Sequence, residues 1–304
     1  MIHGVINVYK EQGFTSHDVV AKLRGIVGQK KIGHTGTLDP DAVGVLPVCL
    51  GRATKLCDML TDKDKVYEAV MLLGVETDTQ DVTGQVLKTY DTTGLTEKQV
   101  RDAVAGFEGD YDQIPPMYSA LKVNGKKLYE LAREGKTVER AARRVQIFDI
   151  EILNIELPRV KMRVHCSKGT YIRTLCHDIG QRLGCGACME KLTRTKVSRF
   201  EIKDSLTLAQ IEALKKENRL PEIVIPIDQM FADYVRITVS GEAARLAYNG
   251  NGIKDRDVRK EKNVLDEAYV RVYDDVGDFI GVYQYHEKEH EYLIRKMFYI
   301  KEER

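Results

Sequence analysis

Residues 33–40 have the sequence Gly33-His34-Thr35-Gly36-Thr37-Leu38-Asp39-Pro40, a polar run with two glycines, two threonines and one carboxylate. Small and flexible residues let the backbone approach a ligand closely, and the Asp-Pro pair fixes the turn that presents the carboxylate. By itself, a glycine-rich loop with one aspartate is more often structural than functional. The segments on either side therefore have to show whether Asp39 serves a site.

The chain on both sides of this loop alternates between strand-like and helix-like patterns. We expect the loop to span residues 30–44. Outside it, the pattern predicts a strand over 4–10, a helix over 16–26, a strand over 45–50, a helix over 53–60, a strand over 66–73, a helix from the capping box Thr96-Glu-Lys-Gln99 through Phe107, a basic helix over 126–134, two long strands over 144–166 that turn near Pro158, a helix over 174–183 that ends at Gly184, and a helix over 207–216.

The texture of the sequence changes after Asp233. A short helix over 241–248 is flanked by strands, and residues 269–285 alternate like a hairpin that turns over Asp275-Val-Gly-Asp278. These patterns predict a mixed domain of helices and strands over 1–233 and a smaller β-rich domain over 234–304.

Composition excludes several classes of protein. With 43% hydrophobic and 31% charged residues, the 304-residue chain has the composition of an ordinary globular protein, and its longest apolar runs are only of strand length. We see no signal peptide and no membrane helix, and expect a cytoplasmic location. The net charge of +1 hides an asymmetry: residues 115–203 contain 19 Lys and Arg against 9 Asp and Glu, a local charge of +10. Such asymmetry is typical of a face that binds a polyanion, although a merely solvated basic face has the same composition.

Six cysteines in a chain of this kind are expected to be reduced thiols. The cluster His165-Cys166, Cys176-His177 and Cys185-Gly-Ala-Cys188 could supply four zinc ligands. It contains only one C-x-x-C pair, however, and adjacent residues on a strand point to opposite faces. We therefore favour buried small hydrophobic residues over a metal site.

Four further segments accompany residues 33–40. Their sequences are Lys65-Val-Tyr67-Glu-Ala leading to Thr77-Asp78-Thr79-Gln80-Asp81, Gln113-Ile-Pro115-Pro116-Met-Tyr118-Ser119-Ala120-Leu-Lys122, Cys166-Ser167-Lys168-Gly169-Thr170-Tyr171-Ile172-Arg173-Thr174-Leu175, and Asp178-Ile-Gly180 with Leu183-Gly184-Cys185-Gly186-Ala187. In this order and spacing, the five segments closely resemble the TruB family of tRNA pseudouridine synthases over roughly residues 4–230. The C-terminal segment resembles a PUA-type RNA-binding domain more weakly, by strand pattern and position.

The resemblance implies a fold and a reaction. The fold would be α+β, with a mixed, largely antiparallel sheet, flanking helices and a small PUA-like domain. The reaction would isomerise uridine at position 55 in the T-loop of tRNA to pseudouridine, without metal or cofactor. Asp39 falls at the family's catalytic position, and Arg173 falls at that of its partner. A guanidinium beside a carboxylate favours the ionised form and orients it. The implied partner is the T-arm of tRNA, no membrane is involved, and we expect a monomer.

The resemblance also assigns substrate contacts. Tyr67 falls at the position that stacks on the flipped base, which suits an aromatic face. Tyr171 and Leu192 fall where the family contacts the uracil, and His34 matches a residue that packs against the T-loop. Basic residues in these segments are candidates for phosphate contacts: Lys122, Lys126, Lys127, Arg133, Arg143, Arg144, Lys168, Arg194 and Lys196.

The sequence departs from the family's pattern in the first motif and again just after Asp39-Pro40. Glu11 follows Lys10 where family members commonly have proline, and Asp41-Ala42-Val43-Gly44 replaces Leu-Ala-Thr-Gly. We expect Asp41 to face solvent, since a second carboxylate in the same pocket would raise one pKa. An alternative function remains open at this stage, namely an RNA chaperone that opens the tRNA elbow with little catalysis. A pure binder, however, has no need of Asp39, Tyr67, Tyr171 and Arg173 together.

Overall fold

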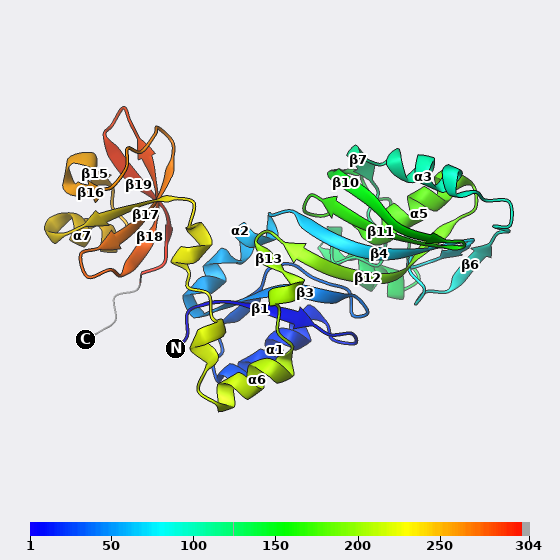
Figure 1. Cartoon of the computed structure of the whole chain (residues 1–304), viewed down its shortest axis with the longest axis horizontal. Helices are drawn as coiled ribbons and strands as arrows, with labels where there is room; N and C mark the ends of the chain where they lie inside the picture. The colour runs from blue at the N-terminus through cyan, green and yellow to red at the C-terminus, as the bar shows by residue number, and fades with distance from the viewer. Residues whose placement is uncertain (124, 300–304) are drawn as a thin grey trace.

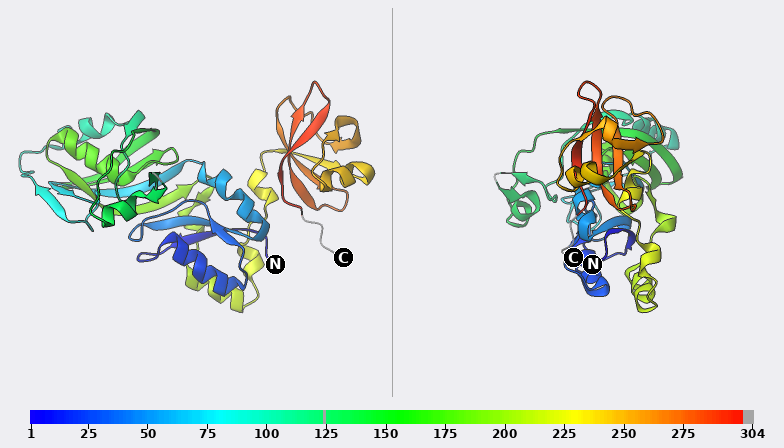
Figure 2. Two further views of the ribbon diagram at one scale, coloured as in Figure 1. Left: turned by 180° about the vertical axis from the view of Figure 1, so that it is seen from behind. Right: turned by 90° about the vertical axis from the view of Figure 1, so that its left-hand side faces the viewer.

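A computed structural model describes residues 1–123 and 125–299 of the chain. The molecule is elongated, with a large sheet and its helices over most of its length and a small sheet at one end (Figures 1 and 2). The large sheet has nine strands in the order β1-β3-β12-β4-β11-β10-β7, with β2 paired to β3 and β13 paired to β12. Its strands are β1 (Gly4–Lys10), β2 (Ile32–His34), β3 (Val43–Leu50), β4 (Lys65–Leu73), β7 (Gly109–Gln113), β10 (Arg143–Glu156), β11 (Arg159–Cys166), β12 (Ala187–Val197) and β13 (Phe200–Glu201).

The small sheet has six strands in the order β15-β19-β18-β17-β14-β16. They are β14 (Val235–Val239), β15 (Ile253–Lys254), β16 (Val258–Lys260), β17 (Tyr269–Asp274), β18 (Phe279–His286) and β19 (Glu291–Met297). Two hairpins stand outside both sheets, β5 (Val75–Thr77) with β6 (Val86–Thr89) and β8 (Lys122–Val123) with β9 (Lys126–Lys127).

Short helices cover the sheets. The α-helices are α1 (Ser16–Val27), α2 (Cys57–Thr61), α3 (Glu97–Ala105), α4 (Leu128–Arg133), α5 (Ile172–Leu183), α6 (Leu208–Lys216) and α7 (Gly241–Tyr248). The 3-10 helices are η1 (Gly51–Leu56), η2 (Ile202–Asp204), η3 (Leu220–Ile223), η4 (Asp228–Phe231) and η5 (Asp255–Asp257).

Strand β3 is buried on both faces, because its alternate side chains enter two different cores. Leu46 and Val48 pack against α1 and α6. Val45 and Cys49 point the other way, toward η1 and α2. The short edge strand β2 pairs with β3, so the loop that carries Asp39 leaves the sheet between two fixed strands.

A third core lies between the other end of the large sheet and helices α3 and α5. Met71 of β4, Met162 of β11 and Ile179 of α5 belong to it. Leu38 and Ala42, on either side of Asp39, are buried in the same cluster. The Asp39 loop is therefore fastened to the core that also supports α5.

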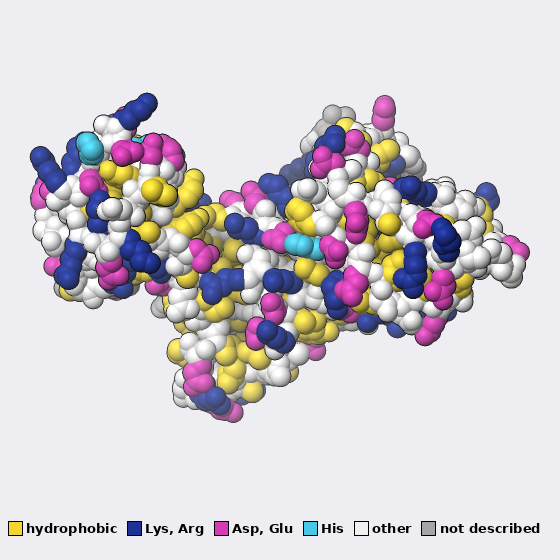
Figure 3. Space-filling view, turned by 45° about the horizontal axis from the view of Figure 1, so that its top comes forward, with side chains coloured by type: hydrophobic (Ala, Val, Ile, Leu, Met, Phe, Trp, Pro, Cys, Tyr) yellow, Lys and Arg dark blue, Asp and Glu magenta, His cyan; other side chains and the backbone are white. Residues whose placement is uncertain are grey.

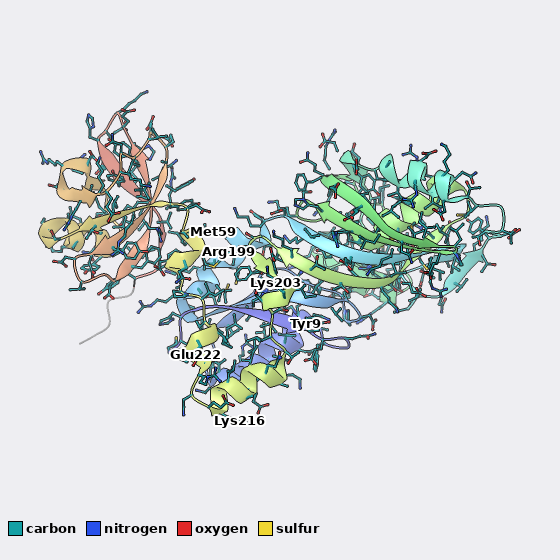
Figure 4. All side chains as sticks on the ribbon, viewed as in Figure 1. Tyr9, Met59, Arg199, Lys203, Lys216 and Glu222 are labelled. Carbon is teal, nitrogen blue, oxygen red and sulfur yellow. The ribbon has the colours of Figure 1, made fainter. Side chains whose placement is uncertain are left out.

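The small sheet is packed against the large one. Val282 and Phe298 share a buried cluster with Val5 and Val45 of the large sheet. The Lys55 ammonium donates a 2.7 Å hydrogen bond to the Met297 carbonyl across the same junction. In Figure 4, Met59 and Arg199 lie at this junction, beside the segment that leads into the small sheet.

The sequence predicted most of these elements. The fold class is confirmed, since the large sheet is antiparallel apart from the pairing of β3 with β12, and the C-terminal part is β-rich. The strands β10 and β11, the β17–β18 hairpin and the capping boxes at Thr96 and Thr207 are as expected. Among the described residues, no helix combines the length and the apolar character needed to cross a membrane.

Three predicted boundaries were wrong. The loop over 30–44 contains β2, which pairs with β3 as an edge strand. The helix over 53–60 is divided into η1 and α2. The helix over 126–134 starts only at Leu128, because Lys126 and Lys127 pair back on β8 after Gly125, whose φ of +83° turns the chain.

Candidate active site

The loop that presents Asp39 is held from below by a buried lysine. Lys10, at the end of β1, has no exposed surface. Its ammonium donates hydrogen bonds to the carbonyls of Pro40 at 2.8 Å and Ala42 at 2.5 Å. Burial lowers the pKa of Lys10 to about 8, although Asp39 acts in the opposite direction. The buried Lys10 ammonium therefore fixes the backbone on the C-terminal side of Asp39.

A buried arginine fixes the other side of the loop. Arg194, on β12, is 1% exposed and donates to the carbonyls of Val45 at 2.8 Å and of Gly36 and Thr37 at 3.4 Å each. The interpretation of Arg194 as a phosphate contact was wrong, because a guanidinium this deeply buried cannot reach RNA. Its side chain shares the inward face of β12 with Leu192.

The Asp39 carboxylate and the Arg173 guanidinium form a two-point ion pair. The Arg173 Nε lies 3.0 Å from one carboxylate oxygen, and Nη2 lies 3.3 Å from the other. Arg173 is 5% exposed and also donates to the carbonyls of Thr79 at 3.1 Å and Tyr118 at 2.9 Å. Because it stands in the first turn of α5, the helix and two separate loops position the carboxylate together.

A second carboxylate approaches the same guanidinium. An oxygen of Asp81 lies 3.7 Å from Arg173 Nη1, and this carboxylate also accepts hydrogen bonds from the Thr79 hydroxyl at 2.8 Å and the Thr83 amide at 3.0 Å. The sequence analysis quoted Asp81 within a motif but gave it no role. The signal that was available was its position at the end of the polar run Thr77-Asp78-Thr79-Gln80-Asp81.

Desolvation dominates the electrostatics of Asp39. Burial raises the pKa of the Asp39 carboxyl and Asp81 raises it further, whereas Arg173 and Lys10 lower it. The guanidinium thus stabilises the ionised form, as expected, but the pKa of Asp39 stays above that of an ordinary aspartate. A desolvated carboxylate with one oriented partner is a stronger base and nucleophile than a solvated one.

Tyr67 and Leu192 form an apolar wall beside the carboxylate. Tyr67 on β4 and Leu192 on β12 are each 8% exposed and belong to the same core cluster as Leu38. The Tyr67 hydroxyl interacts with Arg194, and Asp39 is near enough to raise the pKa of Tyr67 after the larger effect of burial. The ring is therefore held between the loop and the sheet, with little exposed surface.

Tyr171 is positioned by its backbone. It precedes α5, and its amide donates to the Gln113 side chain at 2.7 Å, while the Gln113 amide nitrogen donates back to the Tyr171 carbonyl at 3.0 Å. Burial raises the pKa of the Tyr171 hydroxyl, and the nearby charges of Asp39 and Arg173 also act on it. The structure thus brings Asp39, Arg173, Tyr67, Leu192 and Tyr171 together.

His34 lies on the flank of this cluster. It stands on β2, and its ring meets that of His17 edge to face at 5.2 Å between centroids. Both rings line a surface hollow on α1 and β2. Burial lowers the pKa of His34, so the imidazole is the neutral form at physiological pH.

The phosphate candidates fall into two groups. Lys122, Lys126 and Lys127 are gathered on the β8–β9 hairpin, which follows directly on the loop whose Tyr118 carbonyl binds Arg173. Arg143, which is exposed, lies at the neighbouring end of β10. Arg144 pairs with Asp110 at 3.0 Å and Lys168 pairs with Asp62 at 2.8 Å, both on the surface. On the face shown in Figure 3, basic and acidic side chains are interspersed over the large sheet rather than gathered in one block.

Comparison with known proteins agrees with this geometry. Residues 24–172 match the model of the TruB family pseudouridylate synthase N-terminal domain, and residues 173–232 match that of the tRNA pseudouridylate synthase B C-terminal domain. The chain is 54% identical to tRNA pseudouridine synthase B of Lachnoclostridium phytofermentans, covering 98% of this chain and 100% of that protein. The chain belongs to the TruB family. It is also 46% identical to the synthase B of Clostridium tetani, over 93% of this chain and 96% of that one.

Solved structures with the same fold carry RNA or protein partners. An H/ACA ribonucleoprotein bound to a substrate RNA containing 2′-deoxyuridine includes a chain with a TM-score of 0.73 and 25% identity, covering 98% of this chain and 86% of that one. A Cbf5-Nop10-Gar1 complex gives a TM-score of 0.72 at 26% identity, covering 97% and 85%. The resemblance to the TruB family that the sequence indicated is confirmed.

In the part of this TruB-family chain that the structure describes, the cysteines and histidines do not form a ligand set. Cys166, Cys176 and Cys185 are buried as free thiols, and His165 bonds to Asp64 at 2.6 Å instead. Over residues 1–123 and 125–299, no group of three or more His, Cys, Asp or Glu side chains is arranged to hold a metal ion. The interpretation of the cysteines as buried hydrophobic residues is confirmed for this cluster.

The departures from the TruB pattern are accommodated at the surface. Asp41 is exposed, as expected, and does not share the Arg173 pocket with Asp39. Lys10 donates to the carbonyl of Glu11 at 3.2 Å. Glu11, which stands in the place of proline, therefore shares this lysine with Pro40 and Ala42 of the Asp39 loop.

Proposed function

We propose that this chain converts uridine at position 55, in the T-loop of tRNA, to pseudouridine, with Asp39 as the catalytic carboxylate. The observation that carries the proposal is the Asp39 carboxylate, whose side chain is 41% exposed, held at both oxygens by the buried Arg173. Membership of the TruB family and the names of its relatives support the reaction and the substrate.

In the reaction, the bond between uracil N1 and ribose C1′ breaks and a bond between C5 and C1′ forms. N1 gains a proton, and the hydrogen on C5 is lost to water. An ionised carboxylate can attack C1′ or C6 or remove the 2′ proton, and Asp39 is oriented for such a step by Arg173. The preorganised ion pair costs no reorganisation when charge develops on the substrate.

The side chains around Asp39 suit a flipped pyrimidine. The Tyr67 ring supplies a stacking face, and stacking of about 1–3 kcal/mol offsets part of the cost of unstacking the base. Leu192 supplies an apolar wall, and the Tyr171 hydroxyl a polar contact. We assign His34 to the T-loop on the basis of the TruB resemblance, and its ring packs against that of His17.

We assign tRNA backbone contacts to Lys122, Lys126 and Lys127 of the β8–β9 hairpin, to Arg143 at the start of β10, and to Arg144 and Lys168. The last two form exposed ion pairs, which exchange readily for phosphate because a surface pair contributes little energy. The chaperone function is not favoured, since binding alone does not require a carboxylate held at both oxygens by a buried arginine.

The proposal includes the organisation of the chain. Residues 1–233 would form the catalytic domain and residues 234–304 a PUA-like RNA-binding domain, of which 300–304 lie outside the described residues. The six strands of the small sheet all follow Val235, which supports this division. The protein would act as a cytoplasmic monomer, since one chain supplies every candidate site residue. Light scattering of the purified protein tests the oligomeric state.

Release of tritium from a T-arm hairpin labelled at uridine C5 tests the reaction. Wild-type protein should release the label and Asp39→Asn should not, while Asp41→Asn, an exposed carboxylate two residues away, should behave like wild type. If neither wild type nor Asp39→Asn released tritium while both bound the hairpin, the synthase function would be excluded in favour of the chaperone.

A further inference from the structure

Two adjoining hollows on the surface of α1 and β2 are lined by basic side chains. The first, of about 540 Å³, includes Arg24, Lys30 and Lys31 in its wall, and the second, of about 610 Å³, shares both lysines and adds Lys215 of α6. The residues that line the two hollows include no aspartate or glutamate. The hollows therefore present positive charge without a local counter-charge.

These basic side chains are free to bind a ligand. Arg24, Lys30, Lys31 and Lys215 are exposed, and within residues 1–123 and 125–299 none of them forms an ion pair with a carboxylate. This differs from the large sheet, where Glu68, for example, already pairs with two cations. The folding of the chain uses the backbone of Lys31, whose carbonyl accepts from the Gly51 amide, and not its ammonium.

The basic surface continues to the junction with the small sheet. Lys55 of η1 binds the Met297 carbonyl there, next to Lys296 of β19. After desolvation, the like charges of Lys31, Lys296 and Arg52 lower the pKa of Lys55, so these cations are close enough to repel one another. The buried cluster that joins Val282 and Phe298 to the large sheet keeps their spacing fixed.

Cations crowded in this way repel one another, and binding of a polyanion relieves that repulsion. The first hollow also contains His34, the residue assigned to the T-loop. A single RNA bound at Asp39 would therefore pass over the hollow and toward the small sheet. Phosphates spaced regularly along a helical stem match a track of separated cations, and such contacts position the RNA without reading its sequence.

We propose that the surface formed by Arg24, Lys30, Lys31, Lys55, Lys215 and Lys296 binds the phosphate backbone of a helical stem of the same tRNA, outside the T-arm. The inference rests on the proposed function for the identity of the RNA. It assigns a second contact region to the α1 side of the large sheet, away from the basic segment over 115–203 that the sequence singled out.

The test compares Lys30→Glu/Lys31→Glu with wild type for binding to full-length tRNA and to the isolated T-arm hairpin. For full-length tRNA, the Kd should rise about tenfold near physiological salt, and the slope of log K against log salt should fall by about 2, one contact for each lysine. Hairpin affinity and tritium release from the hairpin should remain close to wild type. Lys63→Glu/Lys191→Glu, the same charge change at two exposed lysines outside both hollows, should leave tRNA binding near wild type.

The following binding results would overturn the inference. Equal losses on tRNA and hairpin would place the surface within the T-arm site, and equal losses in the control variant would reduce it to general electrostatics. Unchanged tRNA binding together with loss of binding to polyglutamate would assign it to an acidic protein. If charge reversal impairs folding, Lys30→Gln/Lys31→Gln provides the same comparison with a smaller expected change. If the wild-type protein released no tritium, the proposed function would be contradicted, but the binding comparison would still test this inference.

Discussion

Arg173 binds both carboxylate oxygens of Asp39, with Nε at 3.0 Å and Nη2 at 3.3 Å, while Nη1 and Nη2 also donate to the carbonyls of Thr79 and Tyr118. Only a planar guanidinium can make all four contacts at once. The charge and the geometry at Asp39 therefore depend on the same residue, and they can be separated by substitution.

Arg173→Lys should retain the charge but lose the two-point grip. We expect kcat for tritium release to fall by about 100-fold or more, since misplacement by about 1 Å has that effect on an oriented reaction. The KM for the hairpin should change much less, because Arg173 is buried away from the RNA backbone. Single-turnover kinetics measure both quantities, and near-normal turnover of this variant would contradict a positioning role.

The pH dependence of turnover should reveal the environment of Asp39. Its pKa is raised, first by burial and then by Asp81, so the acid limb of the kcat profile should lie above the ordinary aspartate value of 3.8. The sign follows because only the ionised form reacts: activity is lost as pH falls through the raised pKa. Asp81→Asn removes one cause of the shift and should move the acid limb to lower pH. An acid limb that stayed in place in this variant would show that Asp81 does not act on Asp39.

The lowered pKa of Lys10 predicts a second limb of the kcat profile, at alkaline pH. Its pKa of about 8 means that the ammonium loses a proton just above neutrality, and an amine has too few hydrogens for the carbonyls of Glu11, Pro40 and Ala42. The Asp39 loop should then loosen, and kcat should decline above about pH 8. Folding does not explain such a loss, because a lysine whose pKa is lowered on folding adds stability as pH rises from about 8 toward 10.5.

A matched substitution isolates this effect. Lys65 also has a pKa lowered to about 8 by burial, but its ammonium binds the carbonyls of Thr61 and Lys63 instead of the Asp39 loop. Lys10→Met should lower kcat at neutral pH and abolish the alkaline limb, whereas Lys65→Met should preserve it. If the limb vanished in Lys65→Met and survived in Lys10→Met, the assignment to Lys10 would be wrong.

The sequence predicted the pairing of Asp39 with Arg173 but not the part played by Asp81. Residues 77–81 contain two aspartates, and their types do not say which one reaches the arginine. The structure distinguishes them through the backbone. Gln80 adopts a φ of +65° and turns the loop, so that Asp78 accepts from the Gln85 amide while Asp81 faces Arg173. A left-handed glutamine is not visible in a sequence pattern.

Buried cations were missed for a related reason. Arg194 and Lys10 have the side chains of surface residues, and sequence reasoning assigned Arg194 to RNA. Their burial depends on carbonyls that the Asp39 loop presents only after β2 and β3 have paired. The strands themselves were predictable from alternation, whereas their inward-facing charges required the position of a loop from elsewhere in the chain.

Gly44 should be among the least replaceable residues of the loop. It has a φ of +110°, and a Cβ there would stand 2.2 Å from the Arg194 carbonyl oxygen. Gly44→Ala should therefore cost about 4 kcal/mol of unfolding free energy, at the high end for a single substitution. Gly28→Ala, with a φ of +75° and open space around the Cβ, should cost only about 1–2 kcal/mol from strain. Urea denaturation measures both, and equal losses would show that the contact with Arg194 adds nothing.

In the proposed function, Tyr67 stacks on the flipped uracil and also supports the Asp39 loop. Its ring has little exposed surface, and its hydroxyl interacts with Arg194, which holds Gly36 and Thr37. Tyr67→Leu should lower kcat by about 100-fold, the upper range for loss of a base-stacking ring, while the Kd for tRNA changes by about twofold at most. Tyr67→Phe keeps the ring and loses only the contact with Arg194, so its kcat should lie between those of wild type and the leucine variant. Single-turnover tritium release and filter binding measure the two quantities separately. Equal losses of binding and turnover in Tyr67→Leu would show that the ring docks the RNA without acting on the flipped base, since a stacking partner of the reacting uracil acts mainly after the tRNA has bound.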